Sequence, residues 1–305
     1  MGDALWWEEP FVPGRSMPAD STPAARFSRR TLLQASAGLG VGLPAVLAAD
    51  ALMITPRWLT TTSVDMPPLS PPPQGKDAPP AATLMQLSDL HMRQLGSLET
   101  QLLDAVHASL PDLLLFTGDA FDTPQGLDVF AEFLAACPTQ SMPLGILGNW
   151  EYRSGVARQR IATLYEQHGG RLLVNESLEV TTPHGSLVVT GLDDLVQGRP
   201  QQQAATRLSG RSPHLLLAHC PGQRDRLEPQ IRDGIDLILA GHTHGGQIAP
   251  FGMALVTPPG SGRYVRGWYR EDGPAMYVSR GLGTSTLPIR LGVTPELVTI
   301  RWPLA

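Results

Sequence analysis

Residues 83–91, TLMQLSDLH, set the pattern on which the fold prediction rests. The apolar half predicts a buried strand, and Asp89 and His91 follow at the point where that strand would end. The same arrangement returns four times along the chain, in the segments GDAFD (118–122), GNWE (148–151), AHC (218–220) and GHTH (241–244). Loops that follow strand ends can turn polar side chains into a shared cleft, so the five segments predict one common site.

The chain from Thr83 onward alternates between apolar runs and amphipathic stretches. We predict strands at 83–87, 112–116, 143–147, 187–191, 214–217 and 236–240, and helices near 98–110, 126–136, 153–168 and 223–232. Such alternation favours a layered α/β fold in which helices flank sheets. Two other stretches, 171–191 and 247–302, look more like consecutive strands, which favours a mixed or two-sheet arrangement.

Composition limits the classes of protein to consider. The chain has 305 residues, of which 42% are hydrophobic and 17% charged, enough for a sizeable core in one large domain or two small ones. A formal net charge of -5 argues against a general affinity for nucleic acid, and hence against a nuclease. Two cysteines, Cys137 and Cys220, do not form a disulfide framework.

The candidate ligands have the chemistry of a site for two cations. Mixed carboxylate, amide and imidazole ligation suits Mn, Fe or Zn better than Ca or Mg. Two such metals about 3.5–4 Å apart can bind a phosphate ester and generate a hydroxide at neutral pH. The expected metal ligands are Asp89, His91, Asp119, Asn149, His219, His242 and His244.

These five segments resemble those of the calcineurin-like metallophosphoesterase family, which read D-x-H, GD-x-x-D, GNH-E/D, H and GH-x-H. The resemblance runs from about Thr83 to Trp302. Outside the shared core, GLDD (191–194), GHTHGGQI (241–248) and YVSRGLGTSTLPIRLGVTPEL (277–297) are similar to a bacterial subgroup of Tat-exported phosphoesterases. That subgroup is also similar to UDP-2,3-diacylglucosamine pyrophosphatases.

The resemblance implies a four-layer α/β/β/α sandwich with a dimetal site at the carboxyl ends of the strands. It also implies that Asp119 bridges the two metals. One metal would be held by Asp89, His91, Asp119 and His244, and the other by Asp119, Asn149, His219 and His242.

One position departs from the family pattern. Where the family has a His that protonates the leaving group or steadies the phosphate, this chain has Trp150. An indole N–H does not titrate, so Trp150 cannot act as a general acid. Asp122 matches the family carboxylate that orients this His, and it therefore needs another partner, for which the Trp150 indole is one candidate. We take Asp122 and Trp150 as the candidate catalytic positions.

The leading hypothesis is an enzyme, a dimetal hydrolase in which a metal-bridging hydroxide attacks a phosphate ester. The substrate would be a phosphomonoester, a phosphodiester or a lipid-linked pyrophosphate. The alternative is a catalytically weak, metal-holding binding protein, which the Trp150 substitution favours. Arg263, Arg280 and Arg290 could clamp phosphate oxygens or could be structural.

The N-terminal 53 residues predict export. Arg29 and Arg30 precede a stretch without charge from Thr31 to Ala49, which is typical of a substrate of the Tat machinery. A chance arginine pair beside an apolar segment is the alternative. If the Tat interpretation holds, the protein would be periplasmic, or held on the outer side of the cytoplasmic membrane by the apolar segment. We therefore expect a disordered extension (1–30), a Tat signal or membrane anchor (31–53), a connector with a Pro-rich part (54–82) and a metallophosphoesterase catalytic domain (83–305).

Overall fold

The computed structural model describes residues 44–67, 81–206 and 212–304. The chain divides into two units, residues 1–45 and 46–305, and of the first unit only residues 44 and 45, both helical, are described. The twin arginine, the predicted disordered extension and most of the Pro-rich segment lie outside the described residues. Within the described ranges, no helix combines the length and the hydropathy needed to cross a bilayer.

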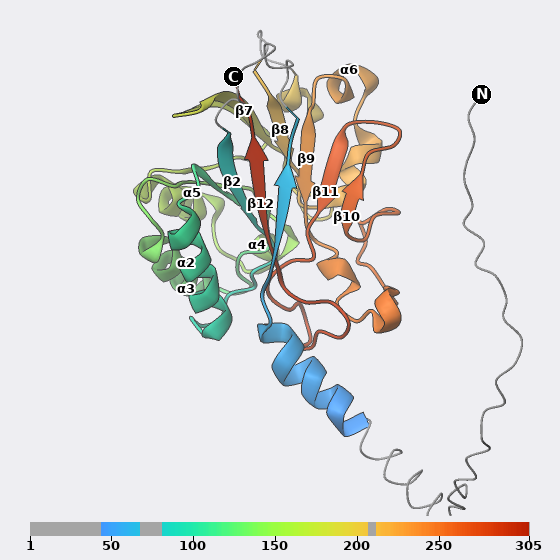
Figure 1. Ribbon diagram of the computed structural model, residues 1–305. Coiled ribbons are helices and arrows are strands. Elements are labelled where there is room, and N and C mark those ends of the chain that lie inside the picture. The colour runs from blue at the N-terminus through green and yellow to red at the C-terminus, as the bar shows by residue number, and fades with distance from the viewer. Residues whose placement is uncertain (1–43, 68–80, 207–211, 305) are drawn as a thin grey trace, which may run out of the picture. The chain divides into compact units, whose positions relative to one another are not determined.

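The second unit contains two six-stranded sheets (Figure 1). In the first sheet, β2, β3, β4 and β5 run parallel to one another, and β12 lies antiparallel to β2 and parallel to β1. Its strands, in spatial order, are β1 (Thr60–Asp65), β12 (Glu296–Trp302), β2 (Ala82–Leu87), β3 (Leu113–Phe116), β4 (Met142–Gly145) and β5 (Arg171–Leu172). Strand β1 lies within the stretch that we predicted as a connector (54–82), so the first sheet includes residues that precede the predicted catalytic domain.

The second sheet has a parallel centre and antiparallel edges. Strands β7, β8, β9 and β11 are parallel, whereas β6 and β10 pair antiparallel at the two ends. In spatial order the strands are β10 (Gly267–Tyr269), β11 (Ala275–Val278), β9 (Leu237–Ala240), β8 (His214–Leu217), β7 (Gly185–Gly191) and β6 (Glu176–Thr182).

Each central strand is apolar on both faces because both faces are buried. In β2, Leu84 points into the core between the sheets, whereas Met85 and Leu87 pack against helices. In β9, Leu239 points into the same inter-sheet core, and Ile238 packs on the opposite side. This alternation gives four layers and confirms the predicted α/β fold of two sheets between helical layers.

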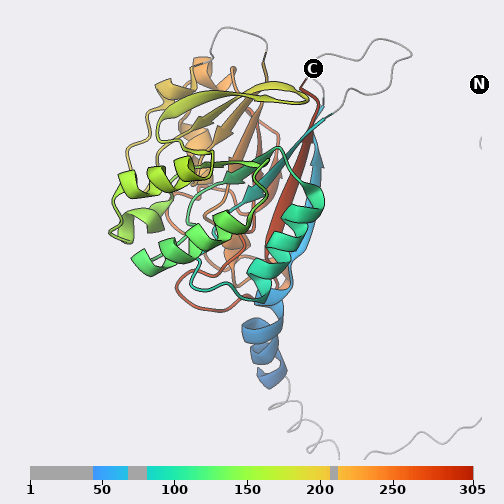
Figure 2. The same cartoon turned by 90° about the vertical axis from the view of Figure 1, so that its left-hand side faces the viewer.

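Helices cover the outer faces of both sheets (Figure 2). Over the first sheet lie α2 (Ser97–Ser109), α3 (Pro124–Ala136) and α5 (Arg158–Gln167). Over the second lie η3 (Gln202–Ala205), η4 (Pro221–Arg226) and α6 (Pro229–Arg232), all short. Other helical segments are residues 44–49, η1 (Asp50–Ile54), η2 (Thr55–Arg57), α4 (Asn149–Arg153), η5 (His244–Gly246) and η6 (Pro250–Gly252).

Two predicted helices differ in the structure. The predicted helix at 153–168 is present as α5 but begins only at Arg158, after a turn in which Gly155 has a positive φ of 74°. The predicted helix at 223–232 is wrong as a single element: η4 ends at Arg226 and α6 begins at Pro229. Proline favours the first position of a helix and disfavours helical geometry in the residue before it, here Glu228, so the break falls at this point.

Candidate metal centre

Two groups of buried side chains meet at the carboxyl ends of the central strands. The first consists of Asp89, His91 and His244, and the second of Asp119, His219 and His242. Within each group, one ligand atom from each residue lies within 4.8 Å of the others. Asp89 and His91 follow β2, Asp119 follows β3, His219 follows β8, and His242 and His244 follow β9. Each group therefore combines residues from both sheets.

In the second group, both imidazole rings are anchored by backbone carbonyls. Nδ1 of His219 lies 2.8 Å from the oxygen of Thr117, and Nε2 of His242 lies 2.8 Å from the oxygen of Pro259. The carbonyls require an N–H from each ring, which leaves the other nitrogen of a neutral ring as an acceptor. These other nitrogens, Nε2 of His219 and Nδ1 of His242, lie 3.0 Å apart, a separation that two ligands of one cation can adopt.

The first group is arranged in a similar way. Nδ1 of His91 lies 2.5 Å from Oδ1 of Asp122, and its Nε2 lies 3.1 Å from Nε2 of His244. A carboxylate behind a histidine sets the ring orientation and makes the other nitrogen a better ligand. The guanidinium of Arg290 lies 3.5 Å from Nδ1 of His244. Both groups thus present two imidazole nitrogens to one point.

Asp119 reaches toward both groups. Its Oδ2 lies 3.2 Å from Nε2 of His219 and 3.8 Å from Nε2 of His91. Its other oxygen, Oδ1, accepts a hydrogen bond of 2.8 Å from the backbone N–H of Trp150. One carboxylate oxygen is thus held by the backbone while the other faces the space between the groups.

Asn149 supplies a direct test of whether these residues suit a cation. Its Oδ1 is buried and has no hydrogen-bond partner among the described residues. A buried amide oxygen without a partner costs about 1–3 kcal/mol, and such groups are rare in folded proteins. A cation beside Oδ1 would remove that cost, so the donor set fits a metal.

The pKa values of the candidate ligands in the metal-free chain also favour metal binding. Burial lowers the pKa of His219, but the nearby carboxylates, Asp119 first, together outweigh burial and raise that pKa well above its usual value. Burial raises the pKa of Asp119, but His219 and His91 outweigh it and hold that pKa low. The pKa values of His242 and His244 are lowered, first by burial and then by neighbouring cationic rings. The site thus holds an ionised carboxylate among rings, two of which stay neutral and able to bind metal.

The backbone at the candidate ligands is strained. Non-glycine residues rarely adopt a positive φ, and each instance costs about 1–3 kcal/mol. Such angles persist where the surrounding structure requires them, and they gather at functional sites. Five of the seven candidate ligands have φ between 47° and 70°: Asp89, His91, Asp119, His242 and His244.

Glu151, which was not among the predicted site residues, connects the loop after β3 to the start of α4 by hydrogen bonds. Its buried carboxylate accepts hydrogen bonds from the backbone N–H groups of Asp119 (3.0 Å), Ala120 (2.6 Å) and Gly148 (2.8 Å). Burial and then the charge of Asp119 raise its pKa to about 7 in the metal-free chain. Glu151 is the last residue of the segment GNWE (148–151) and lies where the family pattern has Glu or Asp, which is the sequence signal that points to it.

The two candidate catalytic positions lie close to the metal groups. Asp122 contacts His91 and also Nη2 of Arg93 at 3.2 Å, and no hydrogen bond joins it to the Trp150 indole in the described part of the chain. The indole instead lies edge-on to the His91 ring, with 5.9 Å between ring centroids. Asp122 therefore orients His91 rather than residue 150.

The three arginines considered as phosphate clamps have structural partners. Arg290 is fully buried and donates to the carbonyl oxygens of Gly283 and Arg280. Arg280 forms an ion pair of 3.2 Å with Glu296. Arg263 is largely exposed and stacks over Tyr264. None of the three lines the cleft, which is the position a clamp would require.

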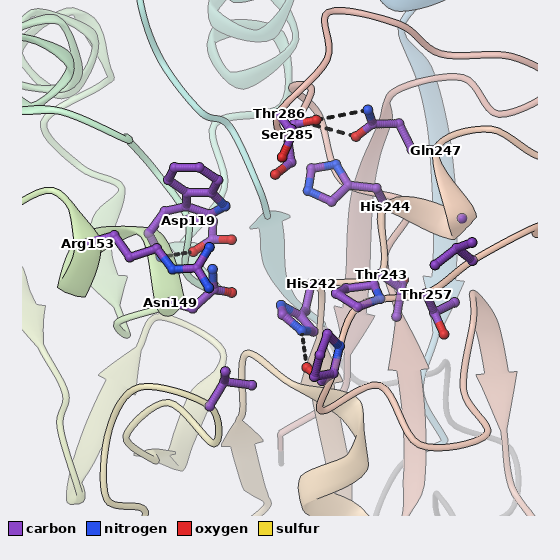
Figure 3. Close-up of a pocket in the computed structure, with 16 residues that line it drawn as sticks. Asp119, Asn149, Arg153, His242, Thr243, His244, Gln247, Thr257, Ser285 and Thr286 are labelled. Carbon is purple, nitrogen blue, oxygen red and sulfur yellow. Dashed lines mark hydrogen bonds between the residues drawn. The ribbon is translucent and has the colours of Figure 1, made fainter.

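A cleft of about 330 Å³ opens over the metal groups (Figure 3). Its walls include Asp119, Asn149, His242 and His244. The cleft is also lined by Arg153, which the sequence analysis did not single out. Four of the seven candidate ligands are therefore reachable by a solute from this cleft, whereas Asp89, His91 and His219 do not line it.

The cleft and its ligands agree with what comparison with known proteins shows. The family model described as "Calcineurin-like phosphoesterase" matches residues 82–246. An uncharacterized metallophosphoesterase of Bacillus subtilis, YkuE, is 34% identical over 226 residues, which are 70% of this chain and 76% of that protein. The phosphodiesterase YaeI of Escherichia coli is 29% identical over 235 residues, 74% of this chain and 84% of that protein.

Among solved structures, a dimetal phosphatase from Danio rerio aligns with a TM-score of 0.46 at 12% identity, covering 74% of this chain and 100% of that one. The family model covers more than half of the chain, and the YkuE alignment spans more than two thirds of it. The chain therefore belongs to the calcineurin-like phosphoesterase family and is a metal-dependent phosphoesterase.

Proposed function

We propose that the chain hydrolyses phosphate esters with two divalent cations held in this cleft. The observation that carries the proposal is the pair of facing ligand groups, with Asp119 between them and an unpaired Asn149 oxygen beside them. Asp89, His91, Asp119 and His244 would hold one cation, and Asp119, Asn149, His219 and His242 the other. Manganese, iron and zinc suit this donor set best.

Two bound cations would supply a hydroxide nucleophile at neutral pH and neutralise charge on the phosphoryl oxygens. The chain's own residues orient the ligands. Asp122 orients His91, and the Thr117 and Pro259 carbonyls orient His219 and His242. Because the rings and the Asp119 carboxylate are already anchored, little reorganisation is needed when substrate binds.

Trp150 makes the reaction sensitive to the leaving group. The indole cannot supply a proton to the departing oxygen. We therefore expect esters with acidic leaving groups, such as aryl esters, to react much faster than alkyl esters. General acid catalysis is typically worth about 10²–10⁴-fold, and this sets the size of the expected difference.

The rim of the cleft favours a substrate with an apolar part, such as a lipid-linked phosphate or pyrophosphate. Four large apolar side chains lie exposed on one short segment: Phe251 (99% exposed), Met253 (66%), Leu255 (65%) and Val256 (76%). Val256 also lines the cleft. Clustered exposed apolar residues commonly mark a binding surface, and an acyl or prenyl chain leaving the cleft would cover these.

We also propose that the protein is exported by the Tat machinery and acts in the periplasm or on the outer side of the cytoplasmic membrane. The support is the sequence of residues 28–49 alone. Replacing Arg29 and Arg30 with Lys should retain the protein in the cytoplasm. Fractionation that still finds the double variant outside would contradict this part of the proposal.

The test of the reaction is an assay of metal-replete protein with p-nitrophenyl phosphate, its bis-ester and a lipid pyrophosphate, with added manganese. Turnover that depends on metal supports the proposed function. Binding of two metals with no turnover of any ester would instead support the alternative, a metal-holding binding protein.

A further inference from the structure

Arg153 differs from Arg280 and Arg290 in that, among the described residues, its side chain has neither a carboxylate nor a carbonyl partner. It lies one helical turn after Trp150 on α4, so that the two side chains are neighbours on one helix face. Its guanidinium carbon lies 5.2 Å from the centroid of the Trp150 ring. In the described ranges of the chain, this stacking is the interaction that the structure gives the Arg153 side chain, and no carboxylate pairs with it.

The position of Arg153 places its charge where an anion would arrive. It lines the same cleft as Asp119 and Asn149. In Figure 3 its side chain runs from α4 toward the side of the cleft where these two residues lie. A free guanidinium at the mouth of a cleft that leads to candidate metal ligands would attract a substrate that carries phosphate.

Stacking on the indole holds this guanidinium in place while its N–H groups stay available to bind phosphate. The guanidinium carbon lies over the indole ring, and its N–H groups, which can bind phosphate oxygens in pairs, have no hydrogen-bond partner among the described residues. A long side chain free in solvent would lose rotamer entropy on binding, and the ring reduces that loss by holding the side chain in place. Trp is the aromatic residue that binds a cation best.

We propose that Arg153, held by Trp150, binds a non-bridging oxygen of the substrate phosphoryl group. This inference rests on the proposed function, because it assumes a phosphate ester in the cleft. Trp150 is then a positioning residue, and the pair supplies the binding of phosphate that the family His gives in the resemblance. It does not supply a proton to the leaving group, because a guanidinium releases none at neutral pH.

The experiment measures binding of inorganic phosphate to metal-replete protein by titration calorimetry, alongside kcat and KM for p-nitrophenyl phosphate. The variants are Arg153→Gln and a matched control, Arg158→Gln, which removes an exposed arginine outside the cleft. A hydrogen bond to a charged group corresponds to about a 10- to 100-fold change in affinity. Arg153→Gln should weaken phosphate binding by that factor with unchanged metal content, whereas Arg158→Gln should bind phosphate like wild type.

Two further variants test the role of the indole. Trp150→Phe keeps an aromatic face and should retain most of the phosphate affinity, whereas Trp150→Leu should lose affinity in the same direction as Arg153→Gln. Equal affinity in Trp150→Phe and Trp150→Leu would overturn the positioning role.

The outcomes separate this inference from the proposed function. If wild-type protein with two metals neither binds phosphate nor hydrolyses any ester, the proposed function is wrong. If wild type does both and Arg153→Gln binds phosphate as tightly as Arg158→Gln, the proposed function stands and the role of Arg153 is wrong.

Discussion

Replacing Glu151 with Ala should both destabilise the fold and weaken metal binding. The Glu151 carboxylate is buried and accepts three backbone N–H groups, from Asp119, Ala120 and Gly148. These bonds tie the segment after β3 to the start of α4. The variant would leave three buried donors without a partner, in a loop whose Asp119 already has a strained φ of 54°.

The size of the loss follows from the number of donors. Each buried N–H left unpaired costs about 1–3 kcal/mol, which gives a range of about 3–9 kcal/mol for three. Water entering from the cleft would satisfy some donors, so we expect the lower end, about 3 kcal/mol. Since a domain is stable by only about 5–15 kcal/mol, such a loss is easy to measure. Loss of an interaction that orients a metal ligand typically weakens metal affinity by about 10–100-fold.

The assay is urea unfolding of the metal-free protein, together with a metal titration of the folded variant. Glu166→Ala is the matched control, because it removes an exposed glutamate from α5. Glu151→Gln should lie between the two, since an amide keeps an oxygen acceptor but turns a donor toward at least one N–H. If Glu151→Ala unfolds within about 1 kcal/mol of the control and binds metal equally well, the reasoning about this network is refuted.

Three other substitutions test separate parts of the account. Asp119→Asn should abolish turnover and lower metal content, and a variant that kept two metals and normal turnover would show that the ligand assignment is wrong. Trp150→His should raise the alkyl-to-aryl rate ratio by no more than about 10², the lower end for a general acid, because Asp122, the carboxylate expected to orient the new ring, already pairs with His91; an unchanged ratio would contradict the missing-acid account. Burial raises the pKa of Glu296, but hydrogen bonds and an ion pair outweigh burial and lower that pKa below 4.5. The ionised Glu296 therefore stabilises the fold above pH 4.5, and this contribution is lost as the pH falls through the lowered pKa. Glu296→Gln should therefore lose less stability on acidification than wild type in urea unfolding, and an equal loss would remove Glu296 from the acid response.

The layered fold could be predicted because the strands at the centre of each sheet are buried on both sides. Segments such as Leu113–Phe116 and Leu237–Ala240 are continuous apolar runs for this reason. Strand β1 could not be found in this way. It is an edge strand in which only Val64 is buried, and its pairing partner β12 lies more than 200 residues away in sequence.

The candidate ligands were found because each follows a predictable strand end. What they contact was not predictable in the same way, since it depends on how separate loops pack. Asp122 pairs with His91, and Arg153 stacks on Trp150, through geometry that residue types alone do not determine. The same holds for Arg290, whose buried position among backbone carbonyls turns a candidate phosphate clamp into a structural residue.

The central claim is that the cleft holds two cations side by side. Electron paramagnetic resonance of protein loaded with manganese tests it most directly, because two Mn²⁺ ions about 3.5–4 Å apart are magnetically coupled. The account predicts two manganese ions per chain and a coupled spectrum, which Asp119→Asn should convert to that of isolated ions or of one ion. A single bound ion in the wild-type chain, or two ions without coupling, would contradict it.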